Sequence, residues 1–257
     1  MSDIDPGGKK AFSARVIALR PQVEYRSDLT ARDREDIYRL RYSAYTREGT
    51  IAKDAPEIFD DVYDDLPNAK LVGIYIEGQL VASFRIHWVN ANFRVYPAMK
   101  VFSDFYDPVI DAGMTIIDPS RFVLDAQYSR KYPLLAYLAC RIPFMACEHY
   151  EADVNFACIR VEHRAFYTRF FEMRQVAPGR VYPSITKLNC LMAADFSFYR
   201  DICRERYPFL LSTEEERGRI FGPKLSMRPR IIHDRIPEYI LNLRNHLPSE
   251  MLIEAAE

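Results

Sequence analysis

The sequence predicts an α/β fold, in which a mixed β-sheet is sandwiched by helices and followed by a helical C-terminal extension. Three observations carry this prediction. Residues 71–76 and 80–88 are apolar, strand-like segments separated by a short turn, which is typical of a hairpin. Apolar stretches at 115–124 and 154–159 enclose a long apolar segment with helical spacing at 132–148. After Asp195 the pattern is helical, so strands and helices alternate first and helices follow.

The N-terminal part is predicted to contain a frayed tail, a first strand and a helix, over residues 1–12, 23–26 and about 31–46. Ser27 or Thr30 is expected to cap the helix, because either side chain can accept a hydrogen bond from the first turn. The acid-rich segment from Glu48 to Asp65 contains Pro56 and is predicted to be a long loop with room for one helical turn. Loops of this length are usually functional or mobile.

The central sheet is predicted from the next hundred residues. Glu77-Gly78-Gln79 is expected to join the two hairpin strands, and residues 90–112, which include two prolines, are expected to be irregular. Pro119 lies inside the strand predicted at 115–124. Because proline cannot donate a ladder hydrogen bond, that strand should be bulged or unpaired at the proline.

The helix at 132–148 is expected to bend at Pro143. A strand, a short aromatic helix and a closing hairpin should follow, at 154–159, 163–171, 175–181 and 186–192. The extension is predicted to contain helices at 196–207, 212–221 and 237–247. Thr213 and Glu216 have the spacing of a capping box for the second of these helices.

Composition limits the classes of function. The 257 residues are 49% hydrophobic and carry a net charge of −1, which suits a globular protein and gives no indication of nucleic acid binding. We expect a domain over 13–195 and an extension over 196–257. No apolar stretch is long enough to span a membrane and no signal peptide is present, so a cytoplasmic protein is predicted. The five cysteines form no CxxC pair, so no metal site is predicted.

Arg85 is the first candidate for chemistry, because it lies within an apolar strand. A bare guanidinium in a buried sheet is costly, so it needs a carboxylate partner. Asp61, Asp64 and Asp118 are the candidates for that partner. The alternative is that Arg85 belongs to a polar strand face directed to solvent.

Asp118 and Arg121 are the second candidate pair, at the predicted bulge. They are three residues apart across the proline, so both side chains can reach one cleft. The alternative is an ordinary ion pair within a turn.

Several features in this order resemble the acyl-homoserine lactone synthases and their relatives, the N-acyl amino acid synthases, over about residues 35–195. They are Arg41 and Tyr45, then Asp61-Val62-Tyr63-Asp64, then Arg85, then Asp118-x-x-Arg121-Phe122-Val123. Members show an arginine and an aromatic residue on the first helix, a D-x-Y-D loop, an arginine in a hairpin strand and an E-x-S-R-F-V segment. The resemblance implies the GNAT acyltransferase fold.

Two departures favour the N-acyl amino acid synthase branch. Asp118 stands where the usual residue is glutamate, which shortens its reach by one methylene. The usual tryptophan after the first helix is missing, since Trp88 is the only tryptophan of the chain.

The resemblance also implies roles for the donor side. Tyr167, in Ala165-Phe166-Tyr167, is similar to the tyrosine of GNAT enzymes that can protonate the departing thiolate; the alternative is an aromatic residue that packs on the sheet. The glycine loop that cradles the pyrophosphate of coenzyme A is absent from 127–133. The phosphopantetheine arm of an acyl carrier protein demands less, and Arg130 and Lys131 suit its phosphate or an acidic carrier surface. Solvated charges at a helix start are the alternative for these two.

The implied reaction is transfer of a long-chain acyl group from the acyl-phosphopantetheine thioester of acyl carrier protein to the α-amine of an amino acid, without a tightly bound cofactor. Asp118 is the first candidate for the base, with Asp61 or Asp64 as alternatives. Arg121 and Arg85 are expected to hold carboxylates, either the substrate's or the enzyme's own.

Substrate contacts are expected from the strands and helices around the bulge. Backbone N–H groups near Phe122 and Val123 are expected to stabilise the oxyanion. Arg41 and Tyr45 complete the predicted site from the first helix. The acyl slot is expected to be lined by aromatic and aliphatic side chains, for most of which core packing is the alternative: Phe84, Phe122, Leu138, Phe144 and Phe156.

Three other functions stay open at this point. One is an acyl-homoserine lactone synthase that uses S-adenosylmethionine. Another is an acetyl-coenzyme A acetyltransferase, which the missing glycine loop disfavours. The third is a non-catalytic acyl-binding module, because a fold alone does not establish activity.

Overall fold

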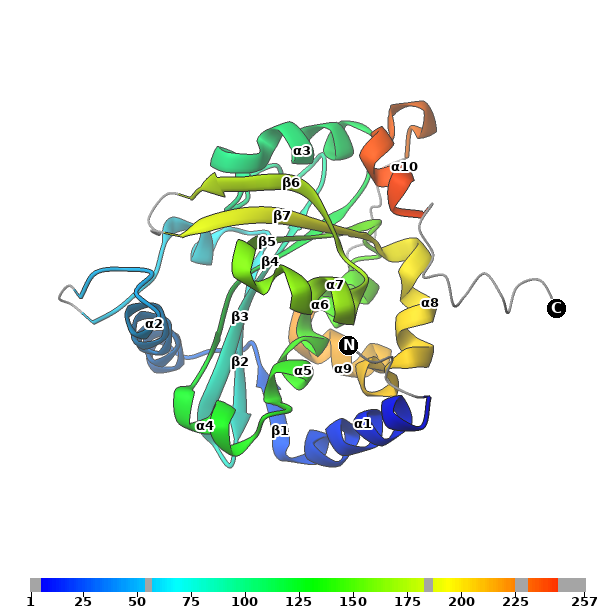
Figure 1. The fold of residues 1–257 in the computed structure, drawn as a ribbon. Helices are drawn as coiled ribbons and strands as arrows, with labels where there is room; N and C mark the ends of the chain where they lie inside the picture. The colour runs from blue at the N-terminus through cyan, green and yellow to red at the C-terminus, as the bar shows by residue number, and fades with distance from the viewer. Residues whose placement is uncertain (1–5, 54–56, 183–186, 225–230, 245–257) are drawn as a thin grey trace.

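The computed structural model describes residues 6–53, 57–182, 187–224 and 231–244, which are drawn as a ribbon in Figure 1. Their centre is a seven-stranded sheet in which β4 and β5 are parallel and all other neighbours are antiparallel. In spatial order the strands are β1 (Val23–Arg26), β2 (Ala69–Ile76), β3 (Gln79–Val89), β4 (Ile116–Leu124), β5 (Val154–Arg160), β7 (Leu188–Asp195) and β6 (Arg174–Val181). The predicted mixed sheet is therefore present.

The β2–β3 hairpin has a two-residue turn. Glu77 and Gly78 both adopt positive φ angles, 51° and 75°, as a twisted hairpin turn requires. Gln79, which was expected in the turn, pairs with Ile76 and begins β3. The left-handed backbone at Glu77 and Gly78 shortens the turn by one residue.

The bulge of β4 lies two residues beyond the proline. Val123 is opposite Ser83 and Ser120 is opposite Arg85, so Arg121 and Phe122 together face the single residue Phe84. Arg121 has a φ of 53°, and Pro119 stays in register with Ile86. The prediction of a bulge is confirmed, but the proline is not its centre. Proline is tolerated because β5 pairs with β4 only as far as Ile117, which leaves the other side of β4 open.

The helices are α1 (Pro6–Leu19), α2 (Ala31–Arg47), α3 (Met99–Asp111), α4 (Ala126–Lys131), α5 (Leu135–Ala139), α6 (Arg141–His149), α7 (Arg164–Phe171), α8 (Phe196–Arg206), α9 (Glu214–Phe221) and α10 (Glu238–Arg244). Short 3₁₀ turns are η1 (Arg20–Gln22), η2 (Val62–Asp65), η3 (Val161–His163), η4 (Pro208–Leu210) and η5 (His233–Arg235).

Several of these helices agree with expectation in detail. Thr30, not Ser27, caps α2 in a full capping box with Asp33. The single turn η2 lies within the predicted long loop. Thr213 caps α9 through the Glu216 N–H at 3.0 Å. The Glu216 carboxylate pairs with Arg141 instead of completing the box.

Three predictions about helices are wrong. Residues 6–12 are not a frayed tail, because they begin α1, where Phe12 packs on Tyr137; residues 1–5 lie outside the described part. Residues 99–111 form α3, which is kinked at Phe102 and holds Pro108 in its last turn. The segment 132–148 is two helices, α5 and α6, that meet at Cys140. Pro143 has no N–H to donate to the Ala139 carbonyl, so the break falls one turn before the proline and separates two helices, where one bent helix was expected.

Two hydrophobic cores cover the two faces of the sheet. One core joins α1, α5, α6, α8 and α9 to β2 and β3, and the other joins α3 and α10 to β5 and β7. Figure 1 shows α3 and α10 together on one side of the sheet. The helical extension thus contributes to both cores. Among the described residues, we find no helix with the length and apolarity that crossing a membrane requires.

Candidate active site

A wedge between β4 and β5 creates the pocket in which most of the predicted site residues lie. The two strands are paired only at Ile116–Val154 and Ile117–Asn155 and then part. The opening is closed by side chains from α2, α5, α6 and α7, and it encloses a cavity of about 430 Å³. This volume is in the range of small-molecule sites. Asp118 lies at the apex of the wedge, one residue beyond the last paired position.

Alternating arginines and aspartates connect α2 to the β4 bulge. This bulge cluster consists of Arg41, Asp64, Arg85, Asp61 and Arg121. Arg41 Nη1 donates to Asp64 Oδ2 at 2.9 Å, and Arg85 Nη1 donates to Asp64 Oδ1 at 3.1 Å and to Asp61. Arg121 Nη2 donates to Asp61 Oδ2 at 2.6 Å. Of the three carboxylates considered as partners of Arg85, Asp61 and Asp64 pair with it.

The bulge cluster keeps both of its aspartates ionised. Burial disfavours the charged form of Asp61, but Arg85 and Arg121 outweigh it and hold its pKa well below the usual range. Burial likewise opposes ionisation of Asp64, and Arg41 and Arg85 lower its pKa. Carboxylates held in this way are poor proton acceptors near neutral pH. The geometry therefore assigns Asp61 and Asp64 to positioning of the arginines and disfavours them as the base.

Asp118, unlike Asp61 and Asp64, has no arginine paired with its carboxylate in the described part of the chain. Its side chain is 1% exposed, and burial raises its pKa to about 7, against smaller effects of Tyr106 and Arg85 that lower it. Among the described residues, neither of its carboxylate oxygens has a hydrogen bond within normal distance, and the same holds for the Tyr106 hydroxyl that faces it. A buried acceptor without a partner that lines a pocket is available to a substrate. A pKa near 7 is also what a general base at neutral pH requires.

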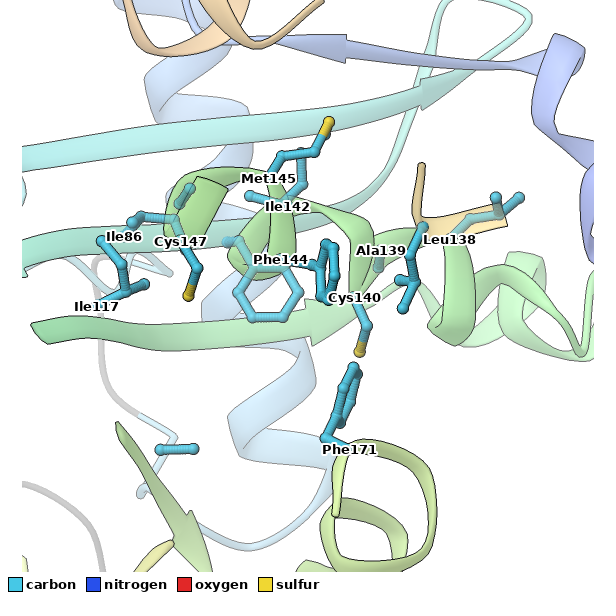
Figure 2. Packing of buried hydrophobic residues seen from close by; sticks show 14 of the residues in the cluster. Ile86, Ile117, Leu138, Ala139, Cys140, Ile142, Phe144, Met145, Cys147 and Phe171 are labelled. Atoms are coloured by element: carbon cyan, nitrogen blue, oxygen red, sulfur yellow. The ribbon is translucent and has the colours of Figure 1, made fainter. Parts of the chain in front are cut away.

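The other half of the pocket is apolar. Phe84 and Phe122 stack with their ring centroids 4.3 Å apart, and Phe144, Cys140 and Tyr167 continue the lining. Figure 2 shows Cys140 directed toward Phe171, with Phe144 beside it. Burial raises the pKa of the Tyr167 hydroxyl, so the phenol stays protonated. Tyr167 therefore fits both alternatives considered for it, because it packs among aromatic residues and also lines the pocket.

Most of the predicted site residues meet at this pocket, and some do not. Those that line it are Tyr45, Phe84, Arg85, Asp118, Arg121, Phe122, Val123, Phe144 and Tyr167. Arg41, Asp61 and Asp64 stand behind the lining in the bulge cluster. Leu138 and Phe156 do not line the pocket and belong to the two cores, as the core alternative held. Arg130 and Lys131 are exposed at the end of α4, outside the lining.

Sequence reasoning missed a polar group at the edge of the pocket. Arg160, at the end of β5, donates to Glu48, at the end of α2, with 2.7 Å between Nη1 and Oε2. His163 accepts from Arg160 Nε at 3.0 Å. No local signal indicates these contacts, because the residues come from segments that only the fold brings together. Tyr106 was missed for a simpler reason: its segment was expected to be irregular.

The mixed sheet, the wedge between two parallel strands and the bulge in one of these strands are the features of a GNAT-fold acyltransferase. The model of the FeeM N-acyl amino acid synthase family matches residues 36–195, so the chain belongs to that family. The predicted fold and acyltransferase activity are confirmed at this level.

Solved structures agree on the fold. FeeM, an N-acyl amino acid synthase from uncultured soil microbes, superposes with a TM-score of 0.60 at 14% identity, over 71% of this chain and 97% of that one. The acyl-homoserine lactone synthase LasI superposes with a TM-score of 0.50 at 14% identity, over 80% and 96% of the two chains. Identities this low show a shared fold only. No curated protein sequence matches this chain significantly.

Proposed function

We propose that this acyltransferase moves a long-chain fatty acyl group from the phosphopantetheine thioester of acyl carrier protein to the α-amine of an amino acid. One observation carries the proposal. Asp118, a buried carboxyl group with a pKa raised to about 7, stands at the apex of a pocket that is polar on one side and apolar on the other. Such a pocket suits an amine and an acyl chain that meet at one base.

The first step is attack of the amine on the thioester carbonyl carbon. The ammonium form of the amino acid must lose a proton before its nitrogen can form the new C–N bond. Asp118 in its carboxylate form accepts that proton, either directly or through one water. A base so placed contributes roughly 10²- to 10⁴-fold to the rate.

Collapse of the tetrahedral intermediate then breaks the C–S bond. Phe122, in the bulge, and Val123, which follows it, offer backbone N–H groups for the oxyanion. The departing thiolate takes a proton from Tyr167, whose raised pKa keeps it protonated until that step. The attacking nitrogen loses a second proton to solvent as it becomes the amide N–H. Tyr167 is later reprotonated from solvent, and the proton on Asp118 also returns to solvent, so the reaction releases one proton overall.

The start of α4 supports a carrier-bound donor over coenzyme A. In GNAT enzymes, the loop after the bulged strand offers its N–H groups to the pyrophosphate. Here Asp125 caps that turn, and its Oδ1 accepts from the N–H groups of Gln127 and Tyr128 at 2.8 and 3.0 Å. A carboxylate already occupies these donors, and its charge repels a pyrophosphate. Arg130 and Lys131, exposed in the next turn, suit the acidic surface or the phosphate of a carrier.

The test uses purified protein, palmitoyl-acyl carrier protein and an equimolar mixture of the twenty amino acids, with mass spectrometry of the products. Palmitoyl-coenzyme A replaces the carrier in a parallel reaction. Asp118→Asn is the control, because the amide has nearly the same shape and cannot accept the proton.

We expect N-palmitoyl amino acids from the carrier-bound donor, at least tenfold less from coenzyme A, and about 10²- to 10⁴-fold less from Asp118→Asn. A folded Asp118→Asn variant with the wild-type rate would remove Asp118 from the mechanism. A homoserine lactone formed only when S-adenosylmethionine is added, with no N-acyl amino acid, would contradict the acceptor.

A further inference from the structure

The arginines of the pocket differ in how tightly they are held. Arg85 is fully buried and Arg121 is nearly so, and both bind the carboxylate of Asp61. Arg160 is different, because its side chain is 18% exposed and its two carboxylate partners, Glu48 at 2.7 Å and Glu162 at 3.5 Å, are 39% and 51% exposed. An ion pair between partly exposed groups is weak, so the partner can be exchanged.

Arg160 lies on the same side of the sheet as Asp118. Side chains of β5 alternate between the two faces, which places Phe156, Cys158 and Arg160 on one of them. Phe156 packs on Tyr106, with 4.6 Å between ring centroids, and the Tyr106 hydroxyl faces Asp118. The charge of Asp118 also acts on the Cys158 thiol. Arg160 follows Cys158 on that face, roughly 7 Å further along the strand.

We propose that Arg160 binds the α-carboxylate of the amino acid acceptor while Asp118 receives a proton from its α-amine. This proposal rests on the proposed function. A guanidinium binds a carboxylate through two parallel N–H···O bonds, which fixes the orientation of the acceptor as well as its position. The amine then points to the apex of the wedge, where the thioester carbonyl lies.

Glu48 acts as a placeholder for that carboxylate. It pairs with Arg160 at 2.7 Å, and Arg47 Nη2 lies 3.7 Å from its Oε1 as a second partner. When the acceptor binds, the Glu48 carboxylate can turn to Arg47 without losing all compensation of its charge. His163 accepts a hydrogen bond from Arg160 Nε and keeps the guanidinium extended. The site therefore selects amines that carry a free carboxylate.

The experiment measures that selectivity directly. Palmitoyl-acyl carrier protein is offered the mixture of twenty amino acids together with the matching mixture of amino acid amides, and mass spectrometry gives the ratio of acid to amide products. Arg160→Gln is compared with wild type. Arg164→Gln is the matched control, because Arg164 is an exposed neighbour that bonds to Gln175 outside the pocket.

Wild type should favour the acids, and Arg160→Gln should lower the acid-to-amide ratio roughly 10- to 100-fold, the effect of losing a charge-assisted hydrogen bond pair. KM for the preferred amino acid should rise with little change in kcat, and the KM of its amide should stay constant. Glu48→Gln should lower the KM of the amino acid severalfold, because it weakens the competing partner. Arg164→Gln should match wild type throughout.

Two results overturn the proposal. An unchanged acid-to-amide ratio in folded Arg160→Gln assigns the carboxylate to another group. Equal use of acids and amides by wild type shows that the carboxylate is not recognised, while N-acyl transfer itself stands. If wild type acylates neither mixture, the proposed function fails, and the carboxylate site fails with it.

Discussion

Two clusters of arginines and carboxylates in this protein have similar composition, but one lies directly behind the pocket and the other lies away from it. The bulge cluster joins α2 and η2 to the sheet directly behind the pocket. The second, the extension cluster, joins α6 to the C-terminal helices and consists of Arg20, Arg141, Glu148, Arg204, Glu216 and Arg217. The Ser212 hydroxyl donates to Glu148 in the same cluster. In each, a fully buried arginine depends on a carboxylate from a distant segment. Comparing them distinguishes ion pairs that position active-site residues, in the bulge cluster, from ion pairs that attach the C-terminal helices, in the extension cluster.

The bulge cluster is the more deeply buried of the two. Arg41 and Asp64 are both almost fully buried, so neither charge can turn to water if its partner is removed. In the extension cluster Glu216 is partly exposed, and Arg141 has a further acceptor in the Leu211 carbonyl, at 2.8 Å. Breaking the first cluster should therefore cost more and should also reach the active site.

Asp64→Asn should have the largest effect. The variant leaves Arg41 buried without a countercharge, which we expect to lower the free energy of unfolding by about 3–5 kcal/mol. It also frees one side of Arg85, so acyl transfer should fall even at temperatures where the protein remains folded. Urea unfolding followed by circular dichroism, together with kcat on the folded fraction, checks both effects.

Asp65→Asn is the matched control for this variant. Its carboxylate is the next in the chain, is 80% exposed and pairs with Arg34 at the surface. A surface pair contributes about 0–1 kcal/mol. Equal losses of unfolding free energy in the two variants would show that the buried ion pairs of the bulge cluster contribute no more than a surface pair.

Asp118→Asn, unlike Asp64→Asn, should make the folded protein more stable at high pH. The pKa of Asp118 is raised in the folded state, from an unfolded value of 3.8 to about 7. The folded chain therefore binds the proton more tightly between these values, and the wild type loses stability as pH rises through this window. The amide carries no such penalty, so at pH 8 the variant should be more stable by about 2–4 kcal/mol, at 1.36 kcal/mol for each pKa unit.

Thermal unfolding at pH 4 and pH 8 measures this difference. At pH 4 wild type and Asp118→Asn should unfold at similar temperatures, whereas at pH 8 the inactive variant should unfold later. Asp64 sharpens the contrast, because its lowered pKa makes its contribution to stability present at neutral pH and lost as pH falls below 3.8. A constant difference between the two proteins at both pH values would refute a buried, neutral Asp118.

Glu216→Gln tests the extension cluster. The amide still accepts a hydrogen bond from Arg141 but carries no charge for Arg141 and Arg20, so we expect a loss of about 1–3 kcal/mol in unfolding free energy. Because the cluster lies outside the pocket lining, kcat at low temperature should be unchanged. Glu215→Gln, whose side chain is 81% exposed, should change stability by less than about 0.5 kcal/mol. A lower kcat in folded Glu216→Gln would show that the extension reaches the chemistry.

The two clusters also differ in how well the sequence predicted them. An arginine between Phe84 and Ile86 demands a carboxylate, and the D-x-Y-D motif supplies two, so the bulge cluster follows from local pattern and resemblance. Arg141 lies in an apolar helix in the same way, yet its partner Glu216 lies in a segment whose packing no local pattern gives. The sequence places Glu216 in the capping box of its own helix, a short-range role that gives no indication of the contact with Arg141.

Side-chain direction was the second limit. Phe156 is apolar and adjacent to the wedge, as predicted, but strand alternation turns it away from the acyl side and onto Tyr106. Leu138 lies on the face of α5 that is turned to the core and away from the pocket. The whole of α3 was missed because two prolines outweighed the helical spacing of Phe102, Tyr106 and Val109. That helix provides the Tyr106 hydroxyl, which faces Asp118 and lowers its pKa.

Tyr106→Phe should have the smallest effect and the most specific one. The groups that act on Asp118 are Tyr106 and Arg85, which lower its pKa, and its neighbour His87, which burial and Arg85 keep neutral with a pKa lowered to about 3. Removal of the hydroxyl takes away a polar group that lowers the pKa of Asp118, so this pKa should rise by roughly 0.5–1 unit, the size of one weak polar contact. Since the base acts as a carboxylate, kcat/KM should rise with pH through about 7 in wild type, and this limb should move to higher pH in Tyr106→Phe.

Tyr239→Phe is the matched control, because that hydroxyl donates to the Phe105 carbonyl on the same helix. A shift in both variants would trace the effect to the packing of α3, whereas a shift in Tyr106→Phe alone identifies the hydroxyl as the group that sets the working pH of the base.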